Sequence, residues 1–198
     1  MKPESRKKLA KPFMWTVIVL GTIVFSISVQ NLWIKQIGIG YLALAIITLC
    51  FGSRIIVQIP RCKGQISVSD TFVLLSLLLY GVEAAVLLAG ADALTSSLRI
   101  SKIKTNIAFN TAVFLCSTFL TGFVLRSFFG SMVAFTAQEF TPNFILALSI
   151  MGTVQYIANS GLVAIAVAFR AGEPIWKMWY DNFLWTSITY FAGAFAAG

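Results

Sequence analysis

Long apolar runs, separated by short polar or basic stretches, make up most of this chain. Seven runs of 15 to 26 residues have the length of helices that enter or cross a bilayer: 13–29, 37–51, 66–80, 82–98, 107–125, 144–169 and 183–197. A helix needs about 20 predominantly apolar residues to cross the hydrocarbon core. The pattern predicts an all-α, polytopic transmembrane helical bundle, in which residues 13–198 form a single integral membrane domain after a basic N-terminus at 1–12.

The stretch from 66 to 98 is too long for one ordinary span and short for two, and Gly81 divides it. The positions of the 15 Lys and Arg residues decide between a hairpin and a single crossing. A hairpin puts 13 of them on the side of the N-terminus and 2 on the other side, whereas a single crossing gives 9 and 6. Because short cytoplasmic loops are enriched in Lys and Arg, the sequence predicts a short-helix hairpin, a cytoplasmic N-terminus and a basic cytoplasmic turn at 170–182.

The composition agrees with a membrane protein and changes how the charge is interpreted. Hydrophobic residues make up 58% of the chain and charged residues 11%, against about 25% charged residues in soluble domains. A net charge of +8 would suggest nucleic-acid binding in a soluble protein. Here the basic residues flank apolar runs, so they are interpreted as topology signals and as contacts with anionic headgroups. The lipid bilayer is the expected partner, and nucleic acid is not.

Few side chains in this sequence are able to perform chemistry. Histidine is absent, and Cys50, Cys62 and Cys116 are widely spaced with no CxxC pair. The sequence contains no phosphate-binding loop, no nucleophile elbow and no metal-ligand spacing. We therefore expect no catalytic residue, no metal site, no cofactor and no enzymatic activity in this chain.

Three acidic residues, Asp70, Glu83 and Asp92, lie in or near the predicted hairpin. Ionisable side chains inside a membrane are costly and are candidates for a functional site by default. Asp70 and Glu83 also fit a simpler interpretation, because acids in the first turn of a helix are favoured by the helix dipole. Asp92 lies in the middle of its run, where it either ties helices together or binds a ligand or a proton.

Amide side chains with helical spacing form a second group of candidates. Asn110 lies near the start of the fifth run, and Gln155 and Asn159 are four residues apart in the sixth. Such amides usually form hydrogen bonds between membrane helices, and both this packing role and a ligand pocket remain open. With Asp92, these three residues are candidates for one polar interior, whose ligand the sequence does not identify.

Small residues at a spacing of four occur in two of the runs. Ala85, Ala89 and Ala93 share one face of the fourth run, and Gly193 and Ala197 share a face of the last. Faces of this kind let membrane helices approach closely. The sequence therefore also suggests a homodimer formed through these small-residue faces.

Five short segments resemble a known family: ISVSDTF at 66–72, GVEAA at 81–85, DAL at 92–94, SSLR at 96–99 and WTSITYFAG at 185–193. Over residues 55–198 the chain resembles the N-terminal multi-span membrane sensor region of bacterial cyclic-di-GMP-type signalling proteins. The output domain in that family is a GGDEF diguanylate cyclase or an HD-type phosphohydrolase. Neither output motif is present in this sequence, so no catalytic residue carries over.

The resemblance implies a sensory or anchoring module in the bacterial inner membrane, which relays ligand binding or membrane state to a missing cytoplasmic output domain. It also implies an eighth span, and the apolar ending at 195–198 agrees with a fragment truncated before that span. The alternative is a small-solute membrane transporter, or the substrate-binding membrane subunit of an uptake system, with a solute pocket near the membrane midplane.

Overall fold

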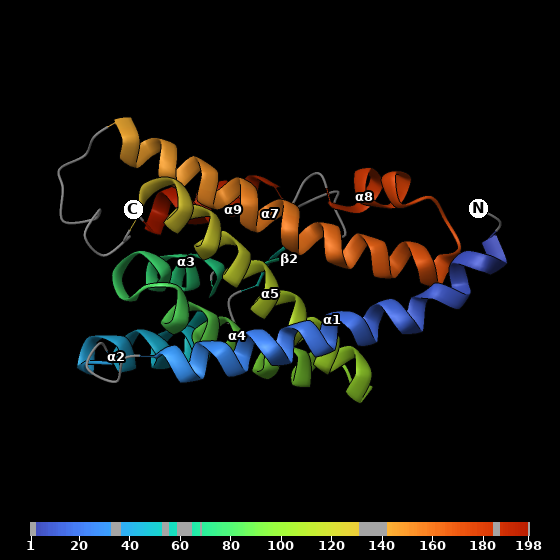
Figure 1. Cartoon of the computed structure of the whole chain (residues 1–198), viewed down its shortest axis with the longest axis horizontal. Helices are drawn as coiled ribbons and strands as arrows, with labels where there is room; N and C mark the ends of the chain where they lie inside the picture. Colours follow the sequence, from blue (N-terminus) through green and yellow to red (C-terminus); the bar gives the residue numbers. More distant parts are fainter. Residues whose placement is uncertain are drawn as a thin grey trace.

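The computed structural model describes residues 3–32, 37–52, 56–58, 65–67, 69–130, 142–183 and 187–197. These residues are mainly helical, which confirms the predicted all-α class (Figure 1). The elements in chain order are α1 (Pro3–Asn31), α2 (Ile39–Ile47), the π-helical turn η2 (Thr48–Gly52), β1 (Ile56–Gln58), β2 (Gln65–Ser67), α3 (Ser69–Tyr80), α4 (Val82–Ile100), α5 (Lys104–Phe129), α7 (Pro142–Ala171), α8 (Ile175–Phe183) and α9 (Ser187–Ala197).

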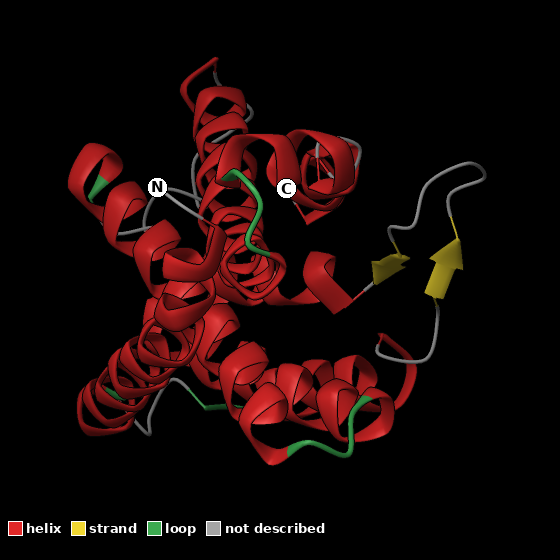
Figure 2. Ribbon diagram, turned by 90° about the vertical axis from the view of Figure 1, so that its right-hand side faces the viewer, coloured by secondary structure: helices red, strands yellow, loops and turns green. Residues whose placement is uncertain are grey.

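The sequence did not predict the strand pair, which is the only β-structure among the described residues. Strands β1 and β2 are antiparallel, with Ile56 opposite Ser67, and they stand apart from the helices (Figure 2). The apolar run that begins at residue 66 therefore contributes first to a strand, and helix α3 starts only at Ser69.

Among the described residues, three helices are long and apolar enough to cross a membrane: Pro3–Asn31, Lys104–Phe129 and Asn143–Ala171. At about 1.5 Å per residue, each exceeds the roughly 30 Å thickness of a hydrocarbon core. Helix α1 leaves large apolar side chains uncovered, including Trp15 at 59% exposure and Val19 at 54%. Such a surface is stable against lipid and unfavourable in water. The structure thus supports a membrane protein. The basic N-terminal residues and the first apolar run form one continuous helix, α1.

The predicted break at Gly81 is present. Helix α3 ends at Tyr80 and α4 begins at Val82, while Gly81 between them has φ 86°, a conformation that glycine adopts readily. The two helices then run back along each other, so that Ser69 at the start of α3 and Asp92 within α4 line the same cavity. With 12 and 19 residues, these helices form the short hairpin that the charge pattern predicts.

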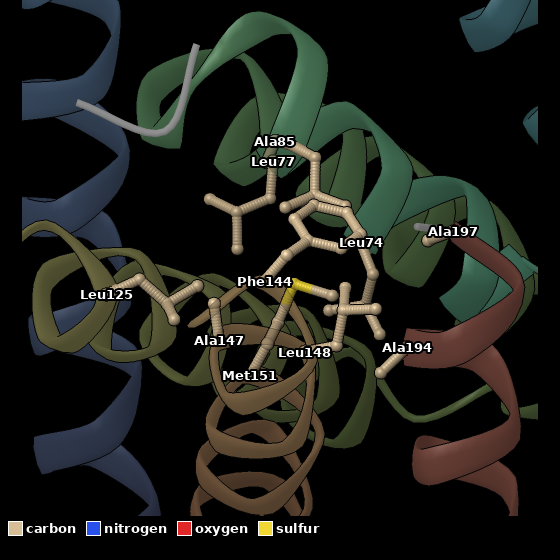
Figure 3. Close-up of a cluster of buried hydrophobic side chains, with 11 residues drawn as sticks. Leu74, Leu77, Ala85, Leu125, Phe144, Ala147, Leu148, Met151, Ala194 and Ala197 are labelled. Atoms are coloured by element: carbon tan, nitrogen blue, oxygen red, sulfur yellow. The ribbon is translucent and has the colours of Figure 1, made fainter. Parts of the chain in front are cut away.

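Helix α5 lies between α1, α4 and α7, and small residues allow the close approach (Figure 1). A Cβ atom placed on Gly21 of α1 would lie 2.6 Å from Ala112 Cβ on α5. Nearer the end of α5, Gly122 packs against Val82 of α4. At one end of the bundle, buried side chains from five helices meet in a core that includes Leu74, Leu125, Phe144, Met151 and Ala194 (Figure 3).

The small-residue faces predicted for a homodimer are covered within the chain. Ala85, Ala89 and Ala93 are at most 3% exposed. Gly193 lies against Thr71 of α3, and Ala197 belongs to the core shown in Figure 3. These residues make their close helix contacts inside one molecule, so a homodimer would have to use other surfaces.

The basic turn predicted at 170–182 is wrong for most of its length. Helix α8 begins at Ile175, and the turn is confined to Gly172–Pro174. The side chain of Trp179 in α8 donates a hydrogen bond to Ser160 Oγ of α7 at 2.9 Å, and Tyr156 Oη donates to the carbonyl of Phe183 at 3.1 Å. Helix α8 therefore folds back along α7, and α9 packs further along the same helix against its first turns.

Candidate functional site

Helices α3, α4, α5 and α7 enclose a polar cavity of about 280 Å³. Its lining combines one carboxyl group, three serine hydroxyls, two amides and several apolar groups. The lining residues are Ser69, Asp92, Ala93, Ser96, Ser97, Ile100, Asn110, Val113, Phe114, Asn159 and Val163. Ile100 is 76% exposed, so the cavity reaches the surface of the bundle near the end of α4.

Asp92 is the acidic group in this cavity. Its side chain is only 4% exposed, and Ser69 makes a side-chain hydrogen bond to its carboxyl group. The atom Asp92 Oδ1 is buried and has no hydrogen-bond partner among the described residues. Since buried polar atoms in native proteins are nearly always paired, this oxygen calls for an explanation beyond helix packing.

Helical spacing explains how the other side chains come to line the same space. On α4, Asp92 and Ser96 are four residues apart and so lie on one face. On α5, Asn110 is followed by Val113 and Phe114 at the third and fourth positions, and on α7 Asn159 is followed by Val163. On α5 and α7, a polar group is thus followed by an apolar group one turn later, whereas α4 presents two polar groups one turn apart.

Three of the four residues predicted to share a polar interior do so. Asp92, Asn110 and Asn159 line the cavity, and Gln155 does not. Gln155 is buried between α5 and α7, where its Oε1 accepts a hydrogen bond from Thr121 Oγ1 at 2.8 Å. Its Nε2 donates to Ser117 Oγ at 3.4 Å and to Thr118 Oγ1 at 3.3 Å. These bonds satisfy both ends of the amide, so Gln155 holds two helices together.

Asp70 and Glu83 lie in first helical turns, as the simpler interpretation of these acids predicted. Asp70 is half-buried, follows the cavity residue Ser69 directly and interacts electrostatically with Asp92, although it does not line the cavity. Glu83 follows the bend at Gly81, nine residues before Asp92, which is about 13 Å along the helix axis. Of the two, only Asp70 belongs to the electrostatic surroundings of the cavity.

The sequence analysis did not single out Ser97, Val113 or Phe114 as site residues. The sequence gives little reason to assign these residues to a site, because serine and apolar residues are common in membrane helices. Only their spacing from Asp92 or Asn110 would have predicted that they lie near the same cavity. Within the part of the chain that the structure describes, no group of three or more His, Cys, Asp or Glu residues is placed to hold a metal ion. Cys50 is exposed and Cys116 is half-buried, while Cys62 lies outside the described residues.

Comparison of the chain with models of known protein families, with curated proteins and with solved structures found no match.

The contrast between Gln155 and Asp92 gives a first expected result. Gln155→Leu removes the partner of three buried hydroxyl groups and is expected to lower the free energy of unfolding by about 1 kcal/mol, the usual scale for such bonds between membrane helices. Thermal unfolding in detergent measures this change. Ser127→Ala removes only a hydrogen bond that an exposed side chain makes within α5, and it serves as the control. Equal losses in both variants would show that the amide does not join the helices.

Proposed function

We propose that this chain is the membrane-embedded sensory module of a bacterial signal-transduction protein, and that the cavity around Asp92 is its ligand site. The observation that carries the proposal is a buried carboxyl group, with one oxygen lacking a hydrogen-bond partner, that lines a cavity between four helices. A membrane protein tolerates such a group chiefly where it has a function. The resemblance of residues 55–198 to sensor regions of cyclic-di-GMP signalling proteins supports the same function.

In this proposal the seven apolar segments of the sequence cross or enter the inner membrane, with the N-terminus in the cytoplasm. Support comes from a grouping of basic segments at one end of the bundle. Gly172 lies against Pro3 and the side chain of Lys7, and Arg170 donates a hydrogen bond to Asn106, in the first turn of α5. The start of α1, the α4–α5 turn and the α7–α8 turn therefore share one end.

The opposite end of the bundle carries the bend at Gly81. There Tyr41 Oη donates a hydrogen bond to the carbonyl of Ala84 at 3.0 Å, and the rings of Tyr41 and Tyr80 are 5.4 Å apart. Arg126, near the end of α5, is a basic residue on this side. The unequal distribution of basic residues favours a cytoplasmic location for the end that contains Lys7, Lys104 and Arg170.

The topology is open to a direct test with reporter fusions. A fluorescent protein fused after Lys104 is expected to be bright and alkaline phosphatase at the same site inactive, while phosphatase fused after Gly130 is expected to be active. The reason is that α4 returns to the basic end and α5 leaves it. Phosphatase activity after Lys104 would mean that α3 and α4 cross the membrane as a single unit.

A ligand in the cavity acts, in this proposal, by changing how α4, α5 and α7 pack. A ligand shifts a conformational equilibrium only if it binds one arrangement more tightly than the other. Asn159 lines the cavity, and the next residue, Ser160, accepts the hydrogen bond from Trp179 of α8. A rotation of α7 at Asn159 would therefore move α8, through which the change would pass to a cytoplasmic output domain.

Signalling by the whole protein tests the sensory function. The complete reading frame that contains this chain, and not the 198 residues alone, is expressed in a bacterial host that carries a cyclic-di-GMP reporter. Asp92→Asn is expected to change the reporter signal at least several-fold, because it removes the acidic group from the cavity. Ser127→Ala, at an exposed position of α5, is expected to leave the signal unchanged. A reporter that responds to neither the protein nor its variants would contradict the sensory proposal.

The cavity also suits the alternative function, transport of a small solute. Many transporters bind solute between helices near the middle of the membrane, often where helices are interrupted. Here α8 and α9 are short consecutive helices, but neither lines the cavity. Uptake of a solute by vesicles that contain the purified chain, together with a silent signalling reporter, would favour the transporter.

A further inference from the structure

We propose that the cavity binds a small organic cation, a protonated amine that carries an apolar group. This inference rests on the proposed function, because it names the ligand class of the same site. It starts from the unpaired oxygen of Asp92, which is more than nine-tenths buried and lines the cavity. A protonated amine has the hydrogen-bond donors and the positive charge that this oxygen lacks.

The balance of charge around the cavity favours a cation. Asp70 adds a second acidic group, which repels Asp92 when both are ionised and would therefore be stabilised by a cation nearby. Arg99 attracts Asp92 from the same face of α4, but it is exposed, lies seven residues away and leaves Oδ1 without a hydrogen-bond partner. An anion entering the cavity would meet two acidic groups and one distant basic group. A neutral ligand would leave the buried carboxylate without a compensating charge.

The rest of the lining fits the two parts of such a ligand. Asn110, Asn159 and Ser97 offer oxygen acceptors for the remaining N–H groups of an ammonium ion, while Val113 and Phe114 offer an apolar wall. The cavity holds about 280 Å³. A cavity of about 150 Å³ accommodates benzene, so this site suits a ligand of roughly ten non-hydrogen atoms.

Three probes of nearly equal size and different charge test the inference on the purified chain. They are 2-phenylethylamine, 2-phenylethanol and phenylacetate, which are cationic, neutral and anionic at neutral pH. Equilibrium dialysis with labelled probes measures their affinities. The amine is expected to bind at least about tenfold more tightly than either of the others. Equal or tighter binding of the alcohol or of phenylacetate, or no binding of the amine up to about 10 mM, would overturn the cation proposal.

Two variants locate the binding in the cavity. Asp92→Asn is expected to reduce amine affinity about tenfold or more, to the level of the alcohol, and Val163→Phe is expected to block all three probes by filling the cavity. Glu83→Gln, an acid outside the cavity, is the matched control and should leave amine binding unchanged. Amine binding that survives both cavity variants would place the ligand elsewhere.

Amine binding and the signalling reporter together distinguish a failure of the cation proposal from a failure of the sensory proposal. Failure of the amine to bind, while Asp92→Asn still changes the signalling reporter, would leave the sensory site in place with a different ligand. Amine binding at Asp92 with a reporter that never responds would support the ligand class and contradict the sensory role.

Discussion

Gly21→Val is expected to separate α1 from α5 and to leave little folded protein after purification. A Cβ atom at this position would lie 2.6 Å from Ala112 Cβ and 2.7 Å from Ala112 Cα. Because the second of these atoms is backbone, no side-chain rotation relieves the clash, and the helices must move apart. Overpacking of this kind typically costs about 1–3 kcal/mol and sometimes more. Thermal unfolding in detergent, together with the monodisperse fraction on gel filtration, measures the effect.

Gly161→Val on α7 is the matched control, because nothing lies within 4 Å of a Cβ atom built at Gly161. Glycine is also a weaker helix former than valine, so this variant is expected to be as stable as the parent chain or slightly more stable. Similar midpoints for the two valine variants would show that α1 does not pack on α5 in the observed way.

Asp92→Asn is expected to raise stability while it weakens binding of the cation about tenfold or more. The carboxyl group is buried, and it has one paired and one unpaired oxygen. A buried polar group without a partner costs about 1–3 kcal/mol, and a charged one costs more. The amide keeps an acceptor for Ser69 and removes the charge, so we expect a gain of about 1 kcal/mol in the free energy of unfolding. Sites that bind ligands often carry such a cost in stability.

The control for this result is Glu83→Gln, which neutralises an acid in the first turn of the same helix, away from the cavity. It removes a favourable interaction with the helix dipole and is expected to lower stability slightly. If Asp92→Asn instead destabilises the chain as Gln155→Leu does, Asp92 is a packing residue and the cavity is not a ligand site.

The apolar pattern predicted where most helices lie, but it did not predict all their ends. Gly81 and the distribution of basic residues along the chain were enough to predict a break that pairs α3 with α4, because neither signal depends on how the helices pack. Residues Gln65–Ser67 pair with Ile56–Gln58, so α3 begins later in the chain than the apolar pattern predicts. The apolar pattern does not show this pairing, because the partner residues lie seven to eleven positions away. In α8 the aromatic residues Trp176, Trp179 and Tyr180 follow helical spacing, and this signal would have predicted a helix in the supposed turn.

The number of membrane-crossing segments shows a second limit of the sequence pattern. Composition identifies apolar runs, yet within the described part of the chain only α1, α5 and α7 combine the necessary length with low charge. Helix α4 has 19 residues and contains Glu83, Asp92 and Arg99. The shorter helix α3 buries six of its residues against its neighbours, whereas in α2 only Tyr41 is buried. The count of seven segments therefore remains a prediction that the reporter fusions test.

The site was partly predictable because two of its features are visible in single helices. A carboxylate in the middle of an apolar run stands out, and so do amides at helical spacing. What a single helix does not show is the register between helices. Gln155 and Asn159 share one face of α7, about 6 Å apart along the axis, but one meets the hydroxyls of α5 and the other meets the cavity.

The measurement that most directly tests the central claim compares two buried serines. Ser97 and Ser117 are 5% and 0% exposed, but only Ser97 lines the cavity. Each is changed to cysteine in a chain whose native Cys50, Cys62 and Cys116 are replaced by serine. The labelling reagent is the small cation 2-aminoethyl methanethiosulfonate, applied in membranes. We expect Ser97→Cys to react at least about tenfold faster than Ser117→Cys, and 2-phenylethylamine to slow that reaction. Equal labelling rates at the two positions, with or without the amine, would contradict a cation-binding cavity at Asp92.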